Sequence, residues 1–121
     1  MHERSLVHSL LTQVKQLSNQ HDAETVDSVT VEIGPLSGVE AELVREAFDE
    51  LAAEHFTNCP LLHIDLVPLQ IRCRSCGRES SVSELSLKCP ECASSRVHIV
   101  RGDEFRLIDV AMQVPVTTDG E

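Results

Sequence analysis

Apolar residues recur at intervals of three and four positions in two stretches of the chain, and this spacing predicts two amphipathic helices. The first helix is expected over residues 4–20, with the apolar stripe Leu6, Val7, Leu10, Leu11, Val14 and Leu17. The second is expected over about residues 40–54, with the apolar stripe Leu43, Val44, Ala47, Phe48, Leu51 and Ala52. Because each stripe covers one side only, each helix is expected to pack that side against another element.

Three further stretches alternate apolar and polar residues, as strands with one buried face do. They are residues 29–33, 62–66 and 105–112. In the first of them the apolar residues alternate with Thr30 and Glu32, which are expected on the polar face. The order of helices and strands predicts an α+β fold, with a small sheet of about three strands and two helices covering one face.

Two Cys-x-x-Cys pairs interrupt this pattern between the second and third strands. They are Cys73/Cys76 and Cys89/Cys92. Each pair places two sulfur atoms on one tight turn, and four thiolates suit a tetrahedral Zn²⁺ ion. Four thiolates also suit iron, whereas a disulfide or a redox pair would explain one pair better than two. A closed four-cysteine site leaves no open position for catalysis, so we expect an inserted, zinc-ribbon-like module with a structural metal.

The turn residues of this module fit the same interpretation. Gly77 follows the first cysteine pair, where a turn that wraps a metal ion often requires a positive φ angle. Pro90 lies inside the second pair and stiffens that turn. The fifth cysteine, Cys59, lies outside both pairs; it is either a small, partly buried side chain or a thiol open to adventitious metal binding or intermolecular oxidation.

Composition narrows the classes of function. The chain of 121 residues carries 20 acidic and 10 basic residues, a net charge of −10, and three Phe residues are its only Phe, Trp or Tyr residues. An acidic chain with few aromatic side chains is a poor candidate for binding nucleic acid. No apolar run approaches the length of a membrane span, and cysteines at metal-binding spacing fit a reducing, cytoplasmic setting. No hydrolase, phosphate-loop or metalloprotease motif is present, so we do not expect an enzyme.

The N-terminus offers a second set of metal ligands. Met1-His2-Glu3 places an α-amine, backbone amides, an imidazole and a carboxylate within three residues. Ni²⁺ or Cu²⁺, which favour nitrogen ligands, could be held by the amine, a deprotonated amide and the His2 imidazole. From residue chemistry alone, a frayed terminus with an ordinary histidine is the alternative.

Taken together and in order, these features resemble the HypA/HybF family of nickel chaperones for hydrogenase and urease maturation. The resemblance covers about residues 1–112. It rests on Met1-His2-Glu3 at the start of an amphipathic helix, Ile33-Gly34, Ser37-Gly38-Val39-Glu40 before the second helix, the two cysteine pairs with Pro90, and the closing strand Phe105–Met112.

The resemblance implies a nickel metallochaperone rather than an enzyme. It implies that labile, transferred Ni(II) is bound by Met1, His2 and Glu3, with His2 indispensable, and that Glu40 is an extra ligand or a neighbour of one. It also implies a structural Zn(II) held by the four cysteines. Some relatives carry histidine after each cysteine pair, whereas this chain does not, so plain four-cysteine coordination is expected.

The resemblance also implies partners and a division of the chain. The partners are an accessory nickel-handling GTPase, the large subunit of nickel–iron hydrogenase and, for some members, urease accessory proteins. The expected domains are a nickel-binding domain (1–70 and 103–114), a zinc-binding domain (71–102) and a flexible tail (115–121). The alternative interpretation is a zinc-ribbon interaction or regulatory module without nickel delivery, which would not need the N-terminal ligands.

Overall fold

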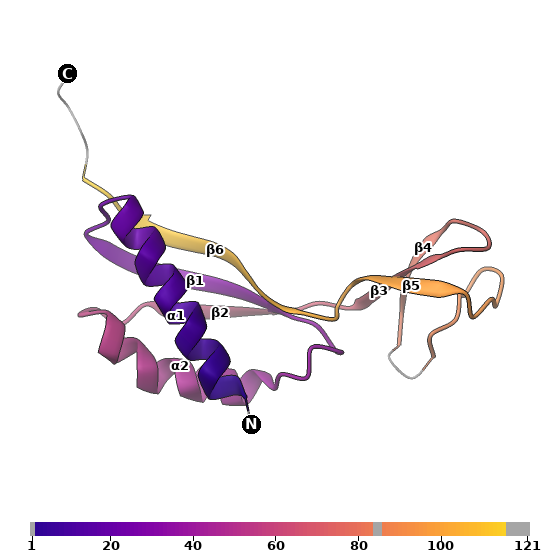
Figure 1. Cartoon of the computed structure of the whole chain (residues 1–121), viewed down its shortest axis with the longest axis horizontal. Coiled ribbons are helices and arrows are strands. Elements are labelled where there is room, and N and C mark those ends of the chain that lie inside the picture. The colour runs from indigo at the N-terminus through magenta and orange to yellow at the C-terminus, as the bar shows by residue number, and fades with distance from the viewer. Residues whose placement is uncertain (1, 84–85, 116–121) are drawn as a thin grey trace, which may run out of the picture. The chain divides into compact units, whose positions relative to one another are not determined.

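The computed structural model describes residues 2–83 and 86–115. Met1 and residues 116–121, which make up nearly all of the predicted tail, lie outside the described residues. The elements, in chain order, are α1 (Glu3–Gln20), β1 (Thr25–Ile33), α2 (Ala41–His55), β2 (Leu61–Leu66), β3 (Leu69–Cys73), β4 (Glu79–Val82), β5 (Val97–Arg101) and β6 (Phe105–Gln113) (Figure 1).

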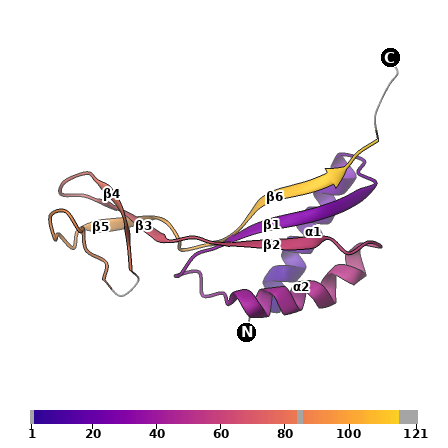
Figure 2. The ribbon, with the colours of Figure 1, turned by 180° about the vertical axis from the view of Figure 1, so that it is seen from behind.

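The first sheet has three strands in the order β2-β1-β6. Helices α1 and α2 pack against each other, and both lie on one face of this sheet (Figure 2). The predicted α+β fold with two helices and a small sheet is therefore confirmed. The strand that comes first in the chain is the central one, so β1 contributes side chains to the core along most of its length, including Val26, Val29 and Val31.

The buried faces of the helices follow the predicted stripes closely. In α1 the buried apolar residues are Val7, Leu10, Leu11 and Val14. In α2 they are Val44, Ala47, Phe48, Leu51 and Ala52. Leu43 was predicted in the second stripe but is 38% exposed. Neither described helix combines the length and apolarity that crossing a bilayer would require.

The second sheet belongs to the inserted module and has the order β4-β3-β5, with both neighbours antiparallel to β3. Strand β4 was not predicted, because its sequence Glu-Ser-Ser-Val is mostly polar. Pairing explains it: Arg72 of β3 lies opposite Glu79 of β4, and the guanidinium forms an ion pair with that carboxylate. The module is thus a small sheet with its own hydrogen-bonded ladder.

Glu32 is the main departure from the predicted strand pattern. Alternation places it on the polar face of β1, yet only 4% of its surface is exposed. Its Oε1 atom accepts a hydrogen bond of 2.8 Å from Nη2 of Arg101, at the end of β5. This hydrogen bond lowers the pKa of Glu32, although burial alone would raise it. The carboxylate is therefore buried as an ion with a specific partner.

Two glycines allow the backbone to approach itself closely beside this ion pair. Gly34 donates its N–H to the carbonyl of Glu104 at 3.1 Å, and Leu36 donates to the carbonyl of Gly102 at 2.9 Å. A Cβ atom on Gly34 would lie 2.1 Å from the Gly102 carbonyl oxygen. Because the overlapping atom belongs to the Gly102 backbone, no side-chain rotation could relieve the overlap. Position 34 therefore cannot carry a side chain in this structure.

The chain forms two compact units. One contains Met1–Val31, Glu40–His63 and Leu107–Glu121, and the other contains Glu32–Val39 and Ile64–Arg106. The second unit thus includes, besides the module, the segment that leads to α2. The functional division into a nickel-binding and a zinc-binding domain stays a prediction.

We predict that Arg101→Met lowers the free energy of unfolding by about 1–2 kcal/mol at neutral pH, because it leaves the buried Glu32 carboxylate without its partner. The loss is modest because about half of the Arg101 side chain is exposed to solvent, which weakens the ion pair. The paired Glu32 has a lowered pKa, so the stability it contributes is present above the ordinary glutamate pKa of about 4.3 and is lost as pH falls. The difference between variant and wild type should therefore shrink on acidification. Urea unfolding of metal-loaded protein measures both effects.

The matched control for this prediction is Arg96→Met, because Arg96 is also exposed and its guanidinium has no ion-pair partner among the described residues. Its unfolding free energy should stay within about 0.5 kcal/mol of wild type. Adding Glu32→Gln to Arg101→Met should restore part of the loss. Equal stability of the two arginine variants would show that the ion pair contributes nothing.

Candidate metal centres

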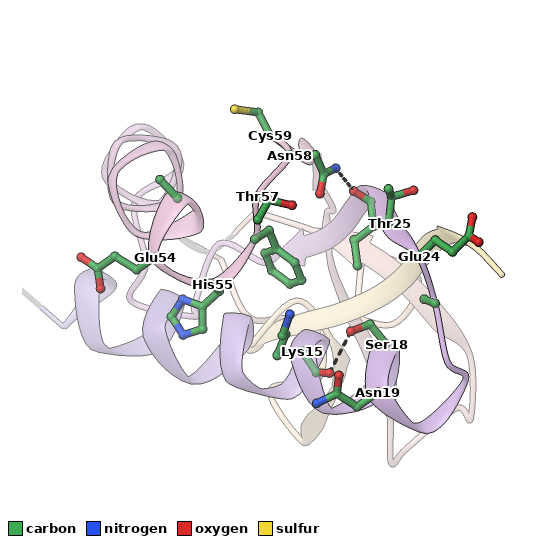
Figure 3. Close-up of a pocket in the computed structure, with 14 residues that line it drawn as sticks. Lys15, Ser18, Asn19, Glu24, Thr25, Glu54, His55, Thr57, Asn58 and Cys59 are labelled. Atoms are coloured by element: carbon green, nitrogen blue, oxygen red, sulfur yellow. Dashed lines mark hydrogen bonds between the residues drawn. The ribbon is translucent and has the colours of Figure 1, made fainter. Parts of the chain in front are cut away.

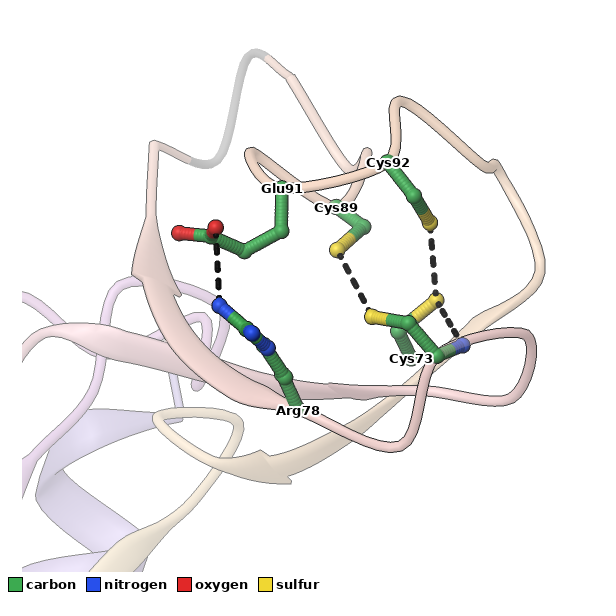
Figure 4. A network of polar contacts seen from close by, with 6 residues as sticks. Cys73, Arg78, Cys89, Glu91 and Cys92 are labelled. Carbon is green, nitrogen blue, oxygen red and sulfur yellow. Dashed lines mark hydrogen bonds and ion pairs between the residues drawn. The ribbon is translucent and has the colours of Figure 1, made fainter.

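Four cysteine side chains converge in the module. The Sγ atoms of Cys73, Cys76, Cys89 and Cys92 all lie within 4.8 Å of one another. The Cys73–Cys92 and Cys76–Cys89 sulfur pairs are each 3.6 Å apart, too far for a disulfide bond of about 2.05 Å (Figure 4). Sulfur atoms around a tetrahedral Zn²⁺ with Zn–S bonds of about 2.3 Å would be roughly 3.8 Å apart. The group therefore fits one tetrahedral metal ion.

The two cysteine turns share one backbone geometry. In the first, Gly77 donates its N–H to the carbonyl of Cys73 at 2.9 Å and has a φ of 78°. In the second, Ala93 donates to the carbonyl of Cys89 at 2.8 Å and has a φ of 63°. The left-handed residue expected after the first pair is thus confirmed. The sequence did not reveal its counterpart, because alanine rarely adopts this conformation.

Backbone N–H groups stabilise the thiolate form of Cys73, which is the form that binds a metal ion. Cys76 and Ser75 donate to Sγ of Cys73 at 3.4 Å and 3.3 Å. The Cys76 N–H, helped by that of Ser75, stabilises the thiolate and lowers the pKa of Cys73 to about 6, against the effect of burial. For Cys92 the N–H of Ser94 also favours the thiolate, but the neighbouring sulfurs and burial raise its pKa to about 12. Four thiolates this close together therefore require a cation.

Polar contacts join the two turns beside the cysteines. Nη1 of Arg78 donates to Oε1 of Glu91 at 3.0 Å (Figure 4). The hydroxyls of Ser75 and Ser94 lie 3.0 Å apart and share a hydrogen bond. These groups are exposed, so each contact adds little stability, but they hold the turns in the arrangement that brings the sulfurs together.

At the other predicted site, the start of α1 lies against the start of α2. Oε2 of Glu3 accepts a hydrogen bond of 3.1 Å from the backbone N–H of Glu40, and Glu3 is only 4% exposed. His2 is exposed at the N-cap of α1, and its carbonyl accepts the N–H of Leu6 at 3.0 Å. Glu3 and the backbone of Glu40 are thus adjacent, while the side chain of Glu40 is exposed and Met1 is outside the described residues.

A cavity of about 450 Å³ lies between the C-terminal ends of α1 and α2 (Figure 3). Two of its polar side chains already bind backbone: Ser18 donates to the carbonyl of Lys15 at 2.9 Å, and Asn58 donates to that of Val26 at 2.6 Å. Cys59 at its edge is exposed, so the partly buried alternative for this thiol was wrong.

Comparisons with known proteins agree on one family. The family model HypA, described as "Hydrogenase/urease nickel incorporation, metallochaperone", matches residues 1–112. A hydrogenase maturation factor from Nitrosospira multiformis is 38% identical over 112 residues, which are 93% of this chain and 97% of that protein. One from Aquifex aeolicus is 36% identical over 114 residues, covering 94% and 99%. The solution structure of the nickel metallochaperone HypA from Helicobacter pylori aligns with a TM-score of 0.71 at 27% identity and covers 95% of this chain and 100% of that one.

We predict that Cys89→Ser lowers the zinc content of the purified protein from about one ion per chain to a small fraction, because a buried thiolate ligand is lost. The module should unfold with the loss, which circular dichroism and proteolysis within residues 71–102 would report. Cys59→Ser is the matched control, since it removes a thiol outside the cluster. Full zinc retention by Cys89→Ser would contradict a four-thiolate site, as would zinc loss from the control.

Proposed function

This chain belongs to the HypA family of nickel metallochaperones in hydrogenase maturation, which are not enzymes, and from this premise we propose that it binds Ni(II) at its N-terminus and delivers it to a nickel enzyme. The proposed ligands are the α-amine and backbone of Met1, the imidazole of His2 and the carboxylate of Glu3, with Glu40 beside them. The four cysteines are proposed to hold a structural Zn(II).

The observation that carries this proposal is the contact between Glu3 and the N–H of Glu40. This hydrogen bond fixes Glu3, the residue after His2, to the start of α2. The exposed His2 imidazole therefore extends from an ordered position rather than from a free chain end. Near Glu3, a groove of about 220 Å³ is also lined by Glu46, Glu50 and Arg4, and the Arg4 guanidinium is paired with Glu50. Because its carboxylates outnumber its one guanidinium, the groove favours the approach of a divalent cation.

The proposed nickel site suits a carrier. Ligands drawn from consecutive residues at a chain terminus can be replaced one at a time by a partner's ligands, so release does not require unfolding. The amine, amide and imidazole must lose protons to bind Ni(II), and we therefore expect affinity to weaken as pH falls.

For the client, we propose the large subunit of nickel–iron hydrogenase, with an accessory nickel-handling GTPase as co-chaperone in the cytoplasm. The names of the similar proteins refer to hydrogenase maturation, which favours this client. The family description also names urease, so urease accessory proteins are proposed as the second set of partners. Residues 1–70 and 103–114 are proposed as the nickel-binding domain and 71–102 as the zinc-binding domain.

We predict that His2→Ala removes the tight nickel site while zinc content and the unfolding transition stay unchanged, because His2 is exposed and makes no side-chain cap bond. Isothermal titration of zinc-loaded protein with NiCl₂ measures the effect. His63→Ala, which removes an exposed imidazole from β2, is the control. Wild-type nickel affinity in His2→Ala would refute the proposed site.

A second prediction concerns the α-amine. A short peptide fused before Met1 converts the amine into an amide and should weaken nickel binding about as much as His2→Ala, because a neutral amide nitrogen is a far poorer ligand. The same peptide fused after Glu121 should have no effect. Absorption spectra of the nickel complex compare the two fusions, and native spectra from the N-terminal fusion would exclude the amine as a ligand.

A further inference from the structure

Two histidines from different helices meet at the surface of the α1–α2 pair. The imidazoles of His8, in α1, and His55, the last residue of α2, have ring centroids 5.4 Å apart and an interplanar angle of 67°. His8 is exposed and His55 is half-buried. Neither residue belongs to the proposed N-terminal site or to the cysteine cluster.

The hydrogen bond of His55 leaves one ring nitrogen available for a metal. Its Nδ1 lies 3.2 Å from the backbone carbonyl of Leu51. A carbonyl oxygen can only accept, so Nδ1 carries the proton and Nε2 keeps its lone pair. Histidines that bind metals usually have this arrangement, with the second ring N–H donated to a carbonyl or carboxylate.

The separation of the rings matches shared coordination. Two imidazoles bound to one tetrahedral ion, with metal–nitrogen distances of about 2.0–2.1 Å, place their ring centroids roughly 5 Å apart. The observed 5.4 Å is close to this value. Shared binding requires one nitrogen of each ring to face the ion, and imidazole suits Ni²⁺, Cu²⁺ and Zn²⁺.

The surroundings also permit a cation. An open pocket of about 390 Å³ is lined by Arg4, Ser5, His8 and Leu51, so there is room for water beside the His8 ring. Of the two nearby basic side chains, Arg4 is neutralised by its ion pair with Glu50. Lys15, whose Nζ lies 5.2 Å from the centroid of the Phe56 ring, keeps its positive charge and therefore lowers the affinity of the site for a cation. Figure 3 shows His55 on the side of α2 that faces α1, with Lys15 nearby.

We propose that His8 and His55 form a second, weaker site for a divalent transition-metal ion, with water as the remaining ligands. With two protein ligands it binds less tightly than a chelate of three or four. His8 is six residues after His2, about 9 Å along a helix axis, so an ion held here lies within reach of the proposed N-terminal site.

The test uses zinc-loaded, full-length protein carrying His2→Ala and Cys59→Ser, which removes the proposed N-terminal imidazole and the free thiol. The α-amine and Glu3 remain in this background, so the assignment rests on the additional effect of the His8 and His55 variants, which the proposed nickel-delivery site does not contain. Titration with NiCl₂ by calorimetry should reveal about one weak equivalent per chain. Adding His8→Gln or His55→Gln should lower that affinity at least about tenfold, whereas His63→Gln should leave it unchanged. Thermal unfolding without nickel checks that each variant is folded.

Imidazole NMR signals of the same background protein give a direct readout. Sub-stoichiometric Ni²⁺ should broaden the ring signals of His8 and His55 before those of His63. The proposal is overturned if the background binds no nickel, if either the His8 or the His55 variant keeps its affinity, or if His63→Gln reduces the affinity equally. Any of these results would identify the ring contact as packing or the binding as unspecific.

Discussion

The close approach of four sulfur atoms is the constraint on which the inserted module depends. Within the described part of residues 64–106, the buried apolar side chains are Leu69, Ile71, Cys73 and Cys89, and two of these are cysteines. So small a core does not offset the conformational entropy lost when the segment is ordered. The sulfurs also cannot all be ionised side by side without a cation. A bound metal ion therefore takes the place of a hydrophobic core, and metal binding and folding become one equilibrium there.

The compact unit that contains α1 and α2 is stabilised differently from the cysteine module. Its core is built from apolar faces of α1, α2 and β1, including Val14, Val29 and Phe48, and no cysteine is among the buried residues described there. Among the groups proposed to bind exchangeable metal, His2 and His8 are exposed, whereas Glu3 is buried and His55 is half-buried. Under the proposed function, one chain combines a metal site that maintains structure with sites that exchange their metal.

The spacing of apolar residues and cysteines along the sequence was sufficient to predict most of the helices and strands and the cysteine cluster. Apolar periodicity identified both helices and the strands of the first sheet, and the spacing of the cysteines identified the cluster. What the sequence did not reveal depends on contacts between distant positions. Strand β4 is too polar to be recognised without its partner β3. Glu32 looks solvent-facing until Arg101 is brought beside it, and nothing near Glu3 in the sequence indicates that it binds the backbone of Glu40.

The hydrogen bond from Glu40 to Glu3 has a consequence for stability. Helix α2 makes no side-chain cap of its own; besides Glu42 in its first turn, it has at its positive end the carboxylate of Glu3, from 37 residues before the Glu40 N–H that binds it. A carboxylate in this position stabilises a helix start by about 0.3–1 kcal/mol. If the first turn of α1 unwinds, α2 loses that stabilisation at once. The stability of the two helix starts is therefore coupled: loss of order at the start of α1 weakens the start of α2 by about this amount.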